Sequence, residues 1–169
     1  VTMTRIHLIG IGGSGLSAIA LLLSELGYTV TGSDRADSTF VRDLRSTGVS
    51  IHIGHSPENV READLVVRSS AIPDDNPEVQ AARAAGIPVL KRSDYLGQLM
   101  VGKTGIAIAG THGKTTTTGM LSWVLHALGA DPSFIIGGVV QNLGTNAHAG
   151  KGETFVIEAD EYDRMFLGL

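Results

Sequence analysis

Two glycine-rich segments of this chain have the residue types and the spacing that bind phosphate groups. The first, Gly10-Ile-Gly-Gly-Ser-Gly15, follows an apolar run at residues 5–9 and precedes apolar residues at helical spacing. Without side chains, such a loop can approach a pyrophosphate, and the helix that follows supplies unpaired N–H groups and partial positive charge. Asp34 ends the next predicted strand, residues 29–33, where a carboxylate can accept hydrogen bonds from a ribose or a base. The segment predicts a nucleotide site, with a ligand-free tight turn as the alternative.

The second segment, Gly110-Thr-His-Gly-Lys-Thr115, predicts a phosphate loop at the start of another helix. Its backbone N–H groups would surround the phosphates, Lys114 would neutralise the terminal phosphates, and the Thr115 hydroxyl would bind Mg²⁺. Ile108 stands where the general G-x-x-x-x-G-K-[ST] pattern has a glycine, so the loop has the shorter form Gly-x-x-Gly-Lys-Thr. Three threonines at 116–118 have low helix propensity, and their hydroxyls suit a phosphate-bound helix start better.

An acidic cluster follows the apolar run at residues 155–157. Its members are Glu158, Asp160, Glu161 and Asp163. So much like charge at one strand end is unfavourable unless a cation lies there, and a magnesium ion beside a bound triphosphate would relieve the repulsion. We therefore predict that Glu158, the first carboxylate after the run, is a metal ligand, with an exposed acidic turn as the alternative.

Polar residues also lie at the ends of two further predicted strands in the first half of the chain. Ser69 and Ser70 come after residues 65–68, and His52 and His55 lie near the end of residues 49–53. Ligands of open α/β sheets bind outside the carboxyl ends of the strands, so Ser70 and His55 are candidate ligand contacts. Simple turn chemistry for the serines and a structural role for the histidines stay open.

The elements that must position these residues alternate between strand and helix. Strands are predicted at 5–9, 29–33, 49–53, 65–68, 89–90, 105–109, 134–136 and 155–157. Helices are predicted after both glycine loops and at 40–47, 77–85 and 94–100, with Gly27 as a helix stop and Pro77 as a helix start. Such alternation indicates parallel pairing with right-handed crossovers. Leu121, Val124, Leu125 and Leu128 are predicted to form the apolar face of the second loop's helix.

The predicted fold class is therefore α/β. We expect a Rossmann-like parallel sheet in an N-terminal domain, residues 1–101, followed by the start of a P-loop α/β domain, residues 102–169. About 65 residues follow this boundary, whereas such a domain usually needs about 100 or more. Since the chain also stops within the apolar stretch 165–169, we expect it to be a fragment of a longer polypeptide.

Composition excludes several classes of protein. The formal net charge of -4 is small and of the wrong sign for a general nucleic-acid binder. The chain has no cysteine, which excludes disulfides and thiolate metal sites. No apolar run is long enough to cross a bilayer, and the first residues lack the pattern of a signal peptide. We therefore expect a cytoplasmic protein without a membrane partner.

With both loops in view, the chain resembles the Mur ligase family over essentially its whole length. The residues that carry the resemblance are Gly10-Ile-Gly-Gly-Ser-Gly15, Ser69-Ser-Ala-Ile72, Gly110-Thr-His-Gly-Lys-Thr-Thr-Thr117 and Glu158-Ala-Asp-Glu161. The shorter phosphate loop is the usual form in this family. The resemblance implies a three-domain, ATP-dependent enzyme. Its first domain holds the UDP part of the substrate, its second binds ATP and Mg²⁺, and its third completes the nucleotide site.

The resemblance and the readings above together give the expected site residues. ATP is expected to contact Gly110, Thr111, His112, Gly113, Lys114, Thr115 and Thr116. Thr115 and Glu158 would bind Mg²⁺, and Lys114 and Glu158 would act in catalysis. The residues expected to contact the UDP-linked substrate are Gly12, Gly13, Ser14, Gly15, Asp34, His55, Ser70 and Asn146, the last of which would line the central cleft.

The implied reaction is the ligation of an amino acid to UDP-N-acetylmuramate in peptidoglycan precursor synthesis. The muramate carboxylate attacks the γ-phosphate of ATP, and the amine of L-alanine then displaces phosphate from the acyl phosphate. The first loop favours members of the family that add L-alanine. Glu161-Tyr-Asp-Arg164 is more similar to members that return a murein tripeptide to UDP-N-acetylmuramate, so this alternative stays open. As a fragment, the chain is expected to bind the UDP ligand weakly and to show no ligase turnover.

Two other classes of function explain part of the pattern. An NAD-dependent oxidoreductase would account for residues 10–34, but it would leave Gly110–Lys114 without a role. A non-catalytic UDP-sugar-binding module is the third alternative. Tighter binding of NADH than of UDP-N-acetylmuramate would favour the oxidoreductase.

Overall fold

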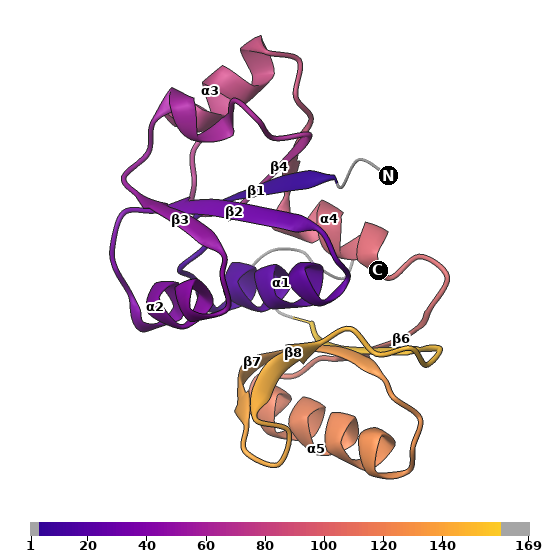
Figure 1. The fold of residues 1–169 in the computed structure, drawn as a ribbon. Helices are drawn as coiled ribbons and strands as arrows, with labels where there is room; N and C mark the ends of the chain where they lie inside the picture. The colour runs from indigo at the N-terminus through magenta and orange to yellow at the C-terminus, as the bar shows by residue number, and fades with distance from the viewer. Residues whose placement is uncertain (1–3, 160–169) are drawn as a thin grey trace. The chain divides into compact units, whose positions relative to one another are not determined.

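The computed structural model describes residues 4–159, and its contacts divide the chain into two compact units, Val1–Arg92 and Ser93–Leu169. Each unit has a sheet of its own with at least one helix packed against it (Figure 1). The predicted α/β fold class is confirmed, as is the parallel sheet of the first unit. Helix α4 (Arg92–Leu99) falls almost wholly in the second unit. The domain boundary between residues 101 and 102 stays a prediction.

The first unit is a five-stranded parallel sheet in the order β3-β2-β1-β4-β5. Its strands are β1 (Arg5–Ile9), β2 (Thr29–Asp34), β3 (Ser50–Ile53), β4 (Leu65–Arg68) and β5 (Val89–Lys91). Its helices are α1 (Ser14–Glu25), α2 (Thr39–Ser46), the 3₁₀ helix η1 (Pro57–Val60) and α3 (Pro77–Ala84). Figure 1 shows α1 and α2 below the sheet and α3 above it. All five strands and all three α-helices of this unit were predicted, whereas η1 was not.

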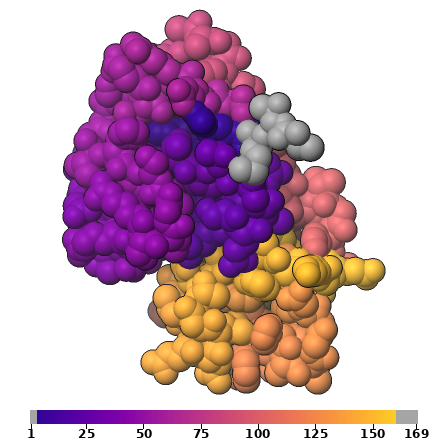
Figure 2. Space-filling view, in the orientation of Figure 1, coloured from indigo at the N-terminus to yellow at the C-terminus, as the bar shows by residue number. Residues whose placement is uncertain are grey.

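The strand order puts β1 at the centre of this sheet, between β2 and β4. A central parallel strand is covered on both faces and therefore has a continuous apolar run. Leu8 and Ile9 are fully buried, and little of the indigo segment is visible in the space-filling view (Figure 2). On one side of the sheet, Ile9 packs in a core cluster with Val66 and Val79. The order also changes direction between β1 and β4, which creates a crevice at the carboxyl ends of these strands.

The helix ends follow the local signals of the sequence. Gly27 has a φ of 86° after the end of α1, a conformation that glycine adopts without strain. Ser38 accepts a hydrogen bond from Val41 N at 3.3 Å and so caps α2. Asn76 accepts one from Glu78 N at 2.9 Å, and Pro77 is the first residue of α3. The predicted helix stop at Gly27 and helix start at Pro77 are confirmed.

The second unit has a four-stranded sheet in the order β6-β9-β7-β8. Its elements are β6 (Thr104–Ile108), α5 (Lys114–Ala127), β7 (Ser133–Val140), β8 (Thr145–His148) and β9 (Thr154–Glu158). Strands β6, β9 and β7 are parallel, but β7 and β8 are antiparallel. The prediction of parallel pairing throughout was wrong here. The short connection between Val140 and Thr145 can form a hairpin, whereas a parallel pair needs a long crossover.

Helix α5 packs on this sheet through only part of its predicted apolar face. Leu121 and Leu125 lie against the buried cluster of Phe134, Ile136 and Val156. Val124 is 49% exposed and Leu128 is 78% exposed, so their predicted place on the packed face was wrong. Leu128 is the C-cap residue, where the helical periodicity has ended. None of the helices in residues 4–159 combines the length and apolar character needed to cross a membrane.

Candidate functional site

The first glycine loop is a tight turn that joins β1 to α1. Gly10 has a φ of 84°, and its N–H donates to Ser33 O at 2.8 Å. Gly12 N donates to Asp34 Oδ2 at 2.9 Å, and Gly13 N donates to Gly10 O at 3.2 Å. Several backbone N–H groups of the loop are therefore already bonded within the protein. These backbone hydrogen bonds fix the conformation of the turn that precedes α1.

The start of α1 remains the part of this loop that is suited to an anion. Gly13 is the N-cap residue, and no side chain caps the helix. The first turn of a helix has N–H groups without intrahelical partners, and the helix dipole adds partial positive charge there. Ser14 and Gly15 are the first residues of this turn. They could therefore bind a diphosphate through their backbone, whereas Gly12 N is bonded to Asp34.

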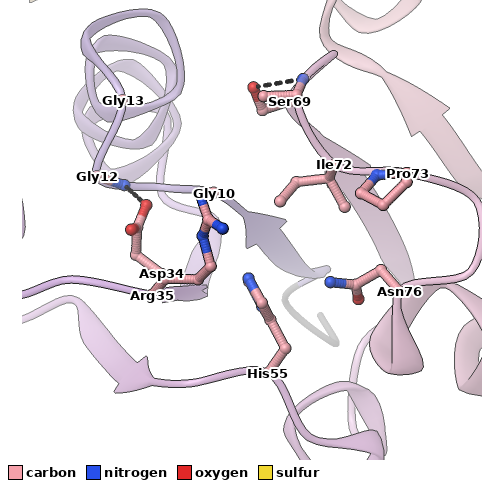
Figure 3. Close-up of a pocket in the computed structure, with 11 residues that line it drawn as sticks. Gly10, Gly12, Gly13, Asp34, Arg35, His55, Ser69, Ile72, Pro73 and Asn76 are labelled. Atoms are coloured by element: carbon pink, nitrogen blue, oxygen red, sulfur yellow. Dashed lines mark hydrogen bonds between the residues drawn. The ribbon is translucent and has the colours of Figure 1, made fainter.

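A pocket of about 480 Å³ opens at the carboxyl edge of the parallel sheet, a size typical of small-ligand sites. Its walls come from the segments that directly follow β1, β2, β3 and β4, together with the start of α3. Figure 3 shows these residues around one space. The lining residues are Gly10, Gly12, Gly13, Asp34, Arg35, His55, Ser69, Ala71, Ile72, Pro73 and Asn76.

The pocket brings together several residues that were predicted from distant parts of the sequence. Gly12, Gly13, Asp34 and His55 all line it. At the end of β4, Ser69 lines the pocket, while the predicted Ser70 is exposed and is not among the lining residues.

Besides Ser70, three predicted substrate contacts do not line this pocket. Ser14 and Gly15 begin α1 next to it, as described above. Asn146 is on β8 in the other unit, where it is 5% exposed. Its predicted place in a central cleft stays a prediction.

Sequence reasoning missed Arg35, Pro73 and Asn76, which also line the pocket. For Asn76 a signal existed, because asparagine before proline at a helix start is a typical N-cap. The structure places this cap at the pocket wall, since α3 starts beside the ends of β1 and β4. Arg35 had no such signal, because an exposed arginine after a strand has no distinctive pattern.

A buried carboxylate lies behind the pocket. Glu78 is fully buried and accepts hydrogen bonds from Ser33 Oγ and Asn59 Nδ2, both at 2.5 Å. His55 Nδ1 is 3.0 Å from Glu78 Oε2, and His7 Nε2 is 3.8 Å from Glu78 Oε1. Burial alone would raise the pKa of Glu78. The contacts from His7, Ser33 and Asn59 outweigh it and lower the pKa from 4.5 to about 2.

The second glycine loop joins β6 to α5. Gly110 has a φ of 146° and Gly113 a φ of 79°, conformations that residues with side chains rarely adopt. Gly113 is the N-cap residue of α5, and no side chain caps the helix. Lys114 Nζ donates to Gly110 O at 2.8 Å, so the lysine reaches back across its own loop. The loop thus has a charged side chain and uncapped N–H groups at one helix start.

Thr115 and Glu158 meet beside this loop, as a shared metal site requires. Thr115 Oγ1 donates to Glu158 Oε2 at 3.1 Å, and Gly137 N donates to Glu158 Oε1 at 2.7 Å. A Cβ on Gly137 would lie 3.2 Å from Glu158 Oε2, so the missing side chain keeps this space open. Carboxylate and hydroxyl oxygens are ligands that Mg²⁺ prefers, with water and phosphate completing its shell. These residues therefore fit a magnesium ion beside a triphosphate.

The other residues predicted around this loop are accessible. Thr111, His112 and Thr116 are exposed. Among residues 4–159, no group of three or more histidine or acidic side chains is close enough to hold a metal ion. The acidic residues Asp160, Glu161 and Asp163 lie outside the described residues. Glu158 is therefore the carboxylate that a metal site built from the described residues would use.

A parallel sheet with a pocket at its carboxyl edge, and a second sheet with a Gly-x-x-Gly-Lys-Thr loop, define an α/β protein of the nucleotide-binding type. Residues 5–104 match the model of the Mur ligase family, catalytic domain. This match spans more than half of the chain. The chain belongs to the Mur ligase family.

Curated relatives are similar over nearly the whole chain. The UDP-N-acetylmuramate–L-alanine ligase of Bordetella avium is 55% identical over 165 residues, which are 98% of this chain and 35% of the relative. The protein of the same name from a Sulfurihydrogenibium species is 53% identical over 165 residues, which are 98% of this chain and 36% of the relative. The chain thus spans about a third of the length of these relatives.

Solved structures have the same fold. The UDP-N-acetylmuramate-alanine ligase of Thermotoga maritima has a TM-score of 0.89 at 37% identity, covering 96% of this chain and 38% of that one. The UDP-N-acetylmuramate:L-alanyl-gamma-D-glutamyl-meso-diaminopimelate ligase of Neisseria meningitides has a TM-score of 0.88 at 34% identity, covering 96% of this chain and 54% of that one. Both amino-acid and peptide ligases are therefore close in fold.

Proposed function

We propose that this chain is the substrate-binding unit and the beginning of the ATP-binding unit of a ligase that joins L-alanine to UDP-N-acetylmuramate. The observation that carries the proposal is the presence of two different anion-receptive loops in one chain. One begins α1 beside the pocket of about 480 Å³, and the other begins α5 beside Lys114 and Glu158. Two loops suit a reaction with two nucleotides, a UDP-linked substrate and ATP.

In this proposal the chain's own residues bind and orient the reactants. The first turn of α1 would hold the diphosphate, and the pocket would hold the uridine. Lys114 would offset negative charge on the ATP phosphates, while Thr115 and Glu158 would hold Mg²⁺. Bound there, the metal would lower the repulsion between the phosphoryl group and an incoming carboxylate. The expected contribution of these residues is positioning and electrostatic stabilisation.

The choice of L-alanine rests on the curated relatives, which carry that name at 53–55% identity. The alternative substrate is the tripeptide named for the Neisseria relative, whose fold is nearly as similar to this chain. Turnover of the full-length protein with L-alanine and with that tripeptide would separate the two. We expect ADP release to depend on L-alanine, and release that depends only on the tripeptide would favour the alternative.

The binding part of the proposal is testable with this chain. Calorimetric titration with UDP-N-acetylmuramate and with NADH compares the ligands of a ligase and of an oxidoreductase. We expect heat of binding from the uridine ligand and none from NADH at the same concentrations. Tighter binding of NADH would overturn the proposal.

A further inference from the structure

Glu78 lies where it can fix the protonated ring nitrogen of His55, a histidine that lines the pocket. Its carboxylate is fully buried, and Oε2 lies 3.0 Å from His55 Nδ1. The neighbouring contacts come from Ser33, Asn59 and the backbone N–H of Ser56, all of which donate to this carboxylate. An ionised carboxylate can only accept hydrogen bonds. The proton of the neutral His55 ring is therefore required on Nδ1.

The position of this proton determines whether the other ring nitrogen, Nε2, donates or accepts a hydrogen bond. When Nδ1 carries the proton of a neutral imidazole, Nε2 is a hydrogen-bond acceptor. Among the described residues, His55 Nε2 is buried and has no hydrogen-bond partner. Figure 3 shows the ring directed from its strand end into the pocket. A buried acceptor without a partner is unfavourable unless a ligand donates to it.

Asn76 presents the opposite hydrogen-bonding group to the same pocket. Its Oδ1 accepts from Glu78 N at 2.9 Å and from Val79 N at 3.4 Å, which caps α3. The amide nitrogen is thereby left as a donor, and Figure 3 shows it directed toward the pocket. The pocket wall thus has an acceptor from His55 and a donor from Asn76.

We propose that Glu78 is a positioning residue that fixes the tautomer of His55, so that His55 and Asn76 select a uracil-type base over a cytosine-type base. Uracil has an N–H next to a carbonyl oxygen, which matches an acceptor next to a donor. Held in the same orientation, cytosine would present its ring-nitrogen acceptor to His55 and its amino donor to Asn76, so both groups would be mismatched. This inference rests on the proposed function, in which the pocket holds a uridine nucleotide.

The test compares the affinities of the chain for UDP and for CDP by calorimetry. These two probes differ only in the base, so their affinity ratio isolates base selection. The wild-type chain should bind UDP about tenfold or more tightly than CDP, as expected for a site that pairs with base edges. Glu78→Gln should reduce this ratio to about threefold or less, because the glutamine amide can also donate to His55 Nδ1.

Two further variants separate selection from folding. Glu62→Gln makes the same chemical change at a carboxylate that is 78% exposed, and it should leave the ratio unchanged. Asn76→Asp keeps a side-chain oxygen that can cap α3 but removes the donor, so it should also lower the ratio. This variant tests the same pairing if Glu78→Gln does not fold.

Nitrogen NMR of the His55 ring provides a readout that needs no ligand. In the neutral His55 ring of the wild-type chain, Nδ1 should carry the proton and Nε2 should not. In Glu78→Gln this preference should be lost, whereas Glu62→Gln should keep it. A wild-type ring with its proton on Nε2 would overturn the assignment of the tautomer.

The outcomes distinguish this inference from the function on which it rests. If the wild-type chain binds neither UDP nor UDP-N-acetylmuramate, the proposed function is overturned, and the base selection with it. If the chain prefers UDP but neither Glu78→Gln nor Asn76→Asp changes the ratio, only the base-selection proposal is overturned. A loss of preference in both variants, with a change of tautomer in Glu78→Gln, supports it.

Discussion

The backbone N–H of Gly12 donates to Asp34 Oδ2 at 2.9 Å, so two residues predicted to contact a ligand are bonded to each other. The second carboxylate oxygen of Asp34 accepts from Ala36 N at 3.2 Å. Asp34 therefore links the turn after β1 to the turn after β2. The relationship gives Asp34 a role in holding the loop, in addition to its place in the pocket wall.

Gly12→Ala should destabilise the first unit. A Cβ at this position would lie 2.8 Å from Val41 Cγ2 and 2.9 Å from both Asp34 Oδ2 and Ser38 Oγ. Relieving such contacts requires the loop and α2 to move apart, which costs about 1–3 kcal/mol of unfolding free energy. Chemical denaturation followed by circular dichroism measures the change.

Gly13→Ala is the matched control for that substitution. The nearest atom to a Cβ on Gly13 is Gly10 O at 3.5 Å, an ordinary contact, and the φ of Gly13 is -79°. The unfolding free energy of this variant should stay within about 0.5 kcal/mol of wild type. Equal destabilisation by the two substitutions would contradict the role assigned to close packing at Gly12.

Arg68→Ala should weaken binding of UDP by about tenfold, equivalent to about 1.4 kcal/mol. The guanidinium of Arg68 donates to Ile72 O at 2.5 Å and to Asp74 Oδ1 at 2.9 Å. It thereby holds the segment after β4, which forms one wall of the pocket. Calorimetric titration with UDP measures the effect.

Arg83→Ala is the control for the loop contact. Arg83 donates to the same Asp74 Oδ1 at 2.7 Å, but its side chain is 52% exposed. Because exposed ion pairs contribute little, UDP affinity should change by about twofold or less. A loss as large as that of Arg68→Ala would show that the Ile72 contact is not what matters.

The first unit should lose stability in acid through Glu78. The pKa of this carboxyl is lowered from 4.5 to about 2 by its donors, so the stabilisation is fully present above pH 4.5 and is lost as the pH falls toward 2. The shift corresponds to a loss on the order of 3 kcal/mol. His7 and His55 are the titratable groups in contact with Glu78.

Denaturation midpoints measured from pH 6 down to pH 2 check this dependence. Glu78→Gln should be less stable than wild type at pH 6, because its amide cannot accept from all the donors, and its acid dependence should be flatter. Glu62→Gln should follow the wild-type curve. A wild-type slope retained in Glu78→Gln would assign the acid sensitivity to other groups.

Glu158→Gln should weaken Mg²⁺-dependent binding of a non-hydrolysable ATP analogue by about tenfold or more. The neutral amide has one oxygen and no charge, so it is a poorer ligand for a hard cation. Glu153→Gln, an exposed residue before β9, is the control and should have no effect. Titrations with and without Mg²⁺ test this, and an equal loss without Mg²⁺ would point to a loop defect instead of a metal site.

Sequence reasoning predicted the first unit well because its signals are local. The inner strands β1 and β4 are largely buried and show as apolar runs, and Gly27 and Pro77 mark helix ends. The carboxyl-edge rule then places Gly12, Asp34 and His55 together, although they come from three strand ends.

The errors arose where tertiary structure decides the outcome. Strand β8 (Thr145–His148) has no apolar run, because it is an edge strand that pairs with β7 through a hairpin. Nothing in the sequence distinguishes Ser69 from Ser70 as the pocket residue, since both are serines that follow the same strand. The buried cluster around Glu78 joins residues 7, 33, 55 and 59, and only the folded chain brings these together.

The most direct test of the account is a crystal of this chain grown with UDP-N-acetylmuramate, a non-hydrolysable ATP analogue and Mg²⁺. We expect diphosphate density at the first turn of α1 and triphosphate density at the first turn of α5, with the metal next to Glu158. Uridine density should lie between His55 and Asn76. Triphosphate at α1, or no nucleotide at α5 under saturating Mg²⁺, would contradict the claim that the two loops hold two different nucleotides.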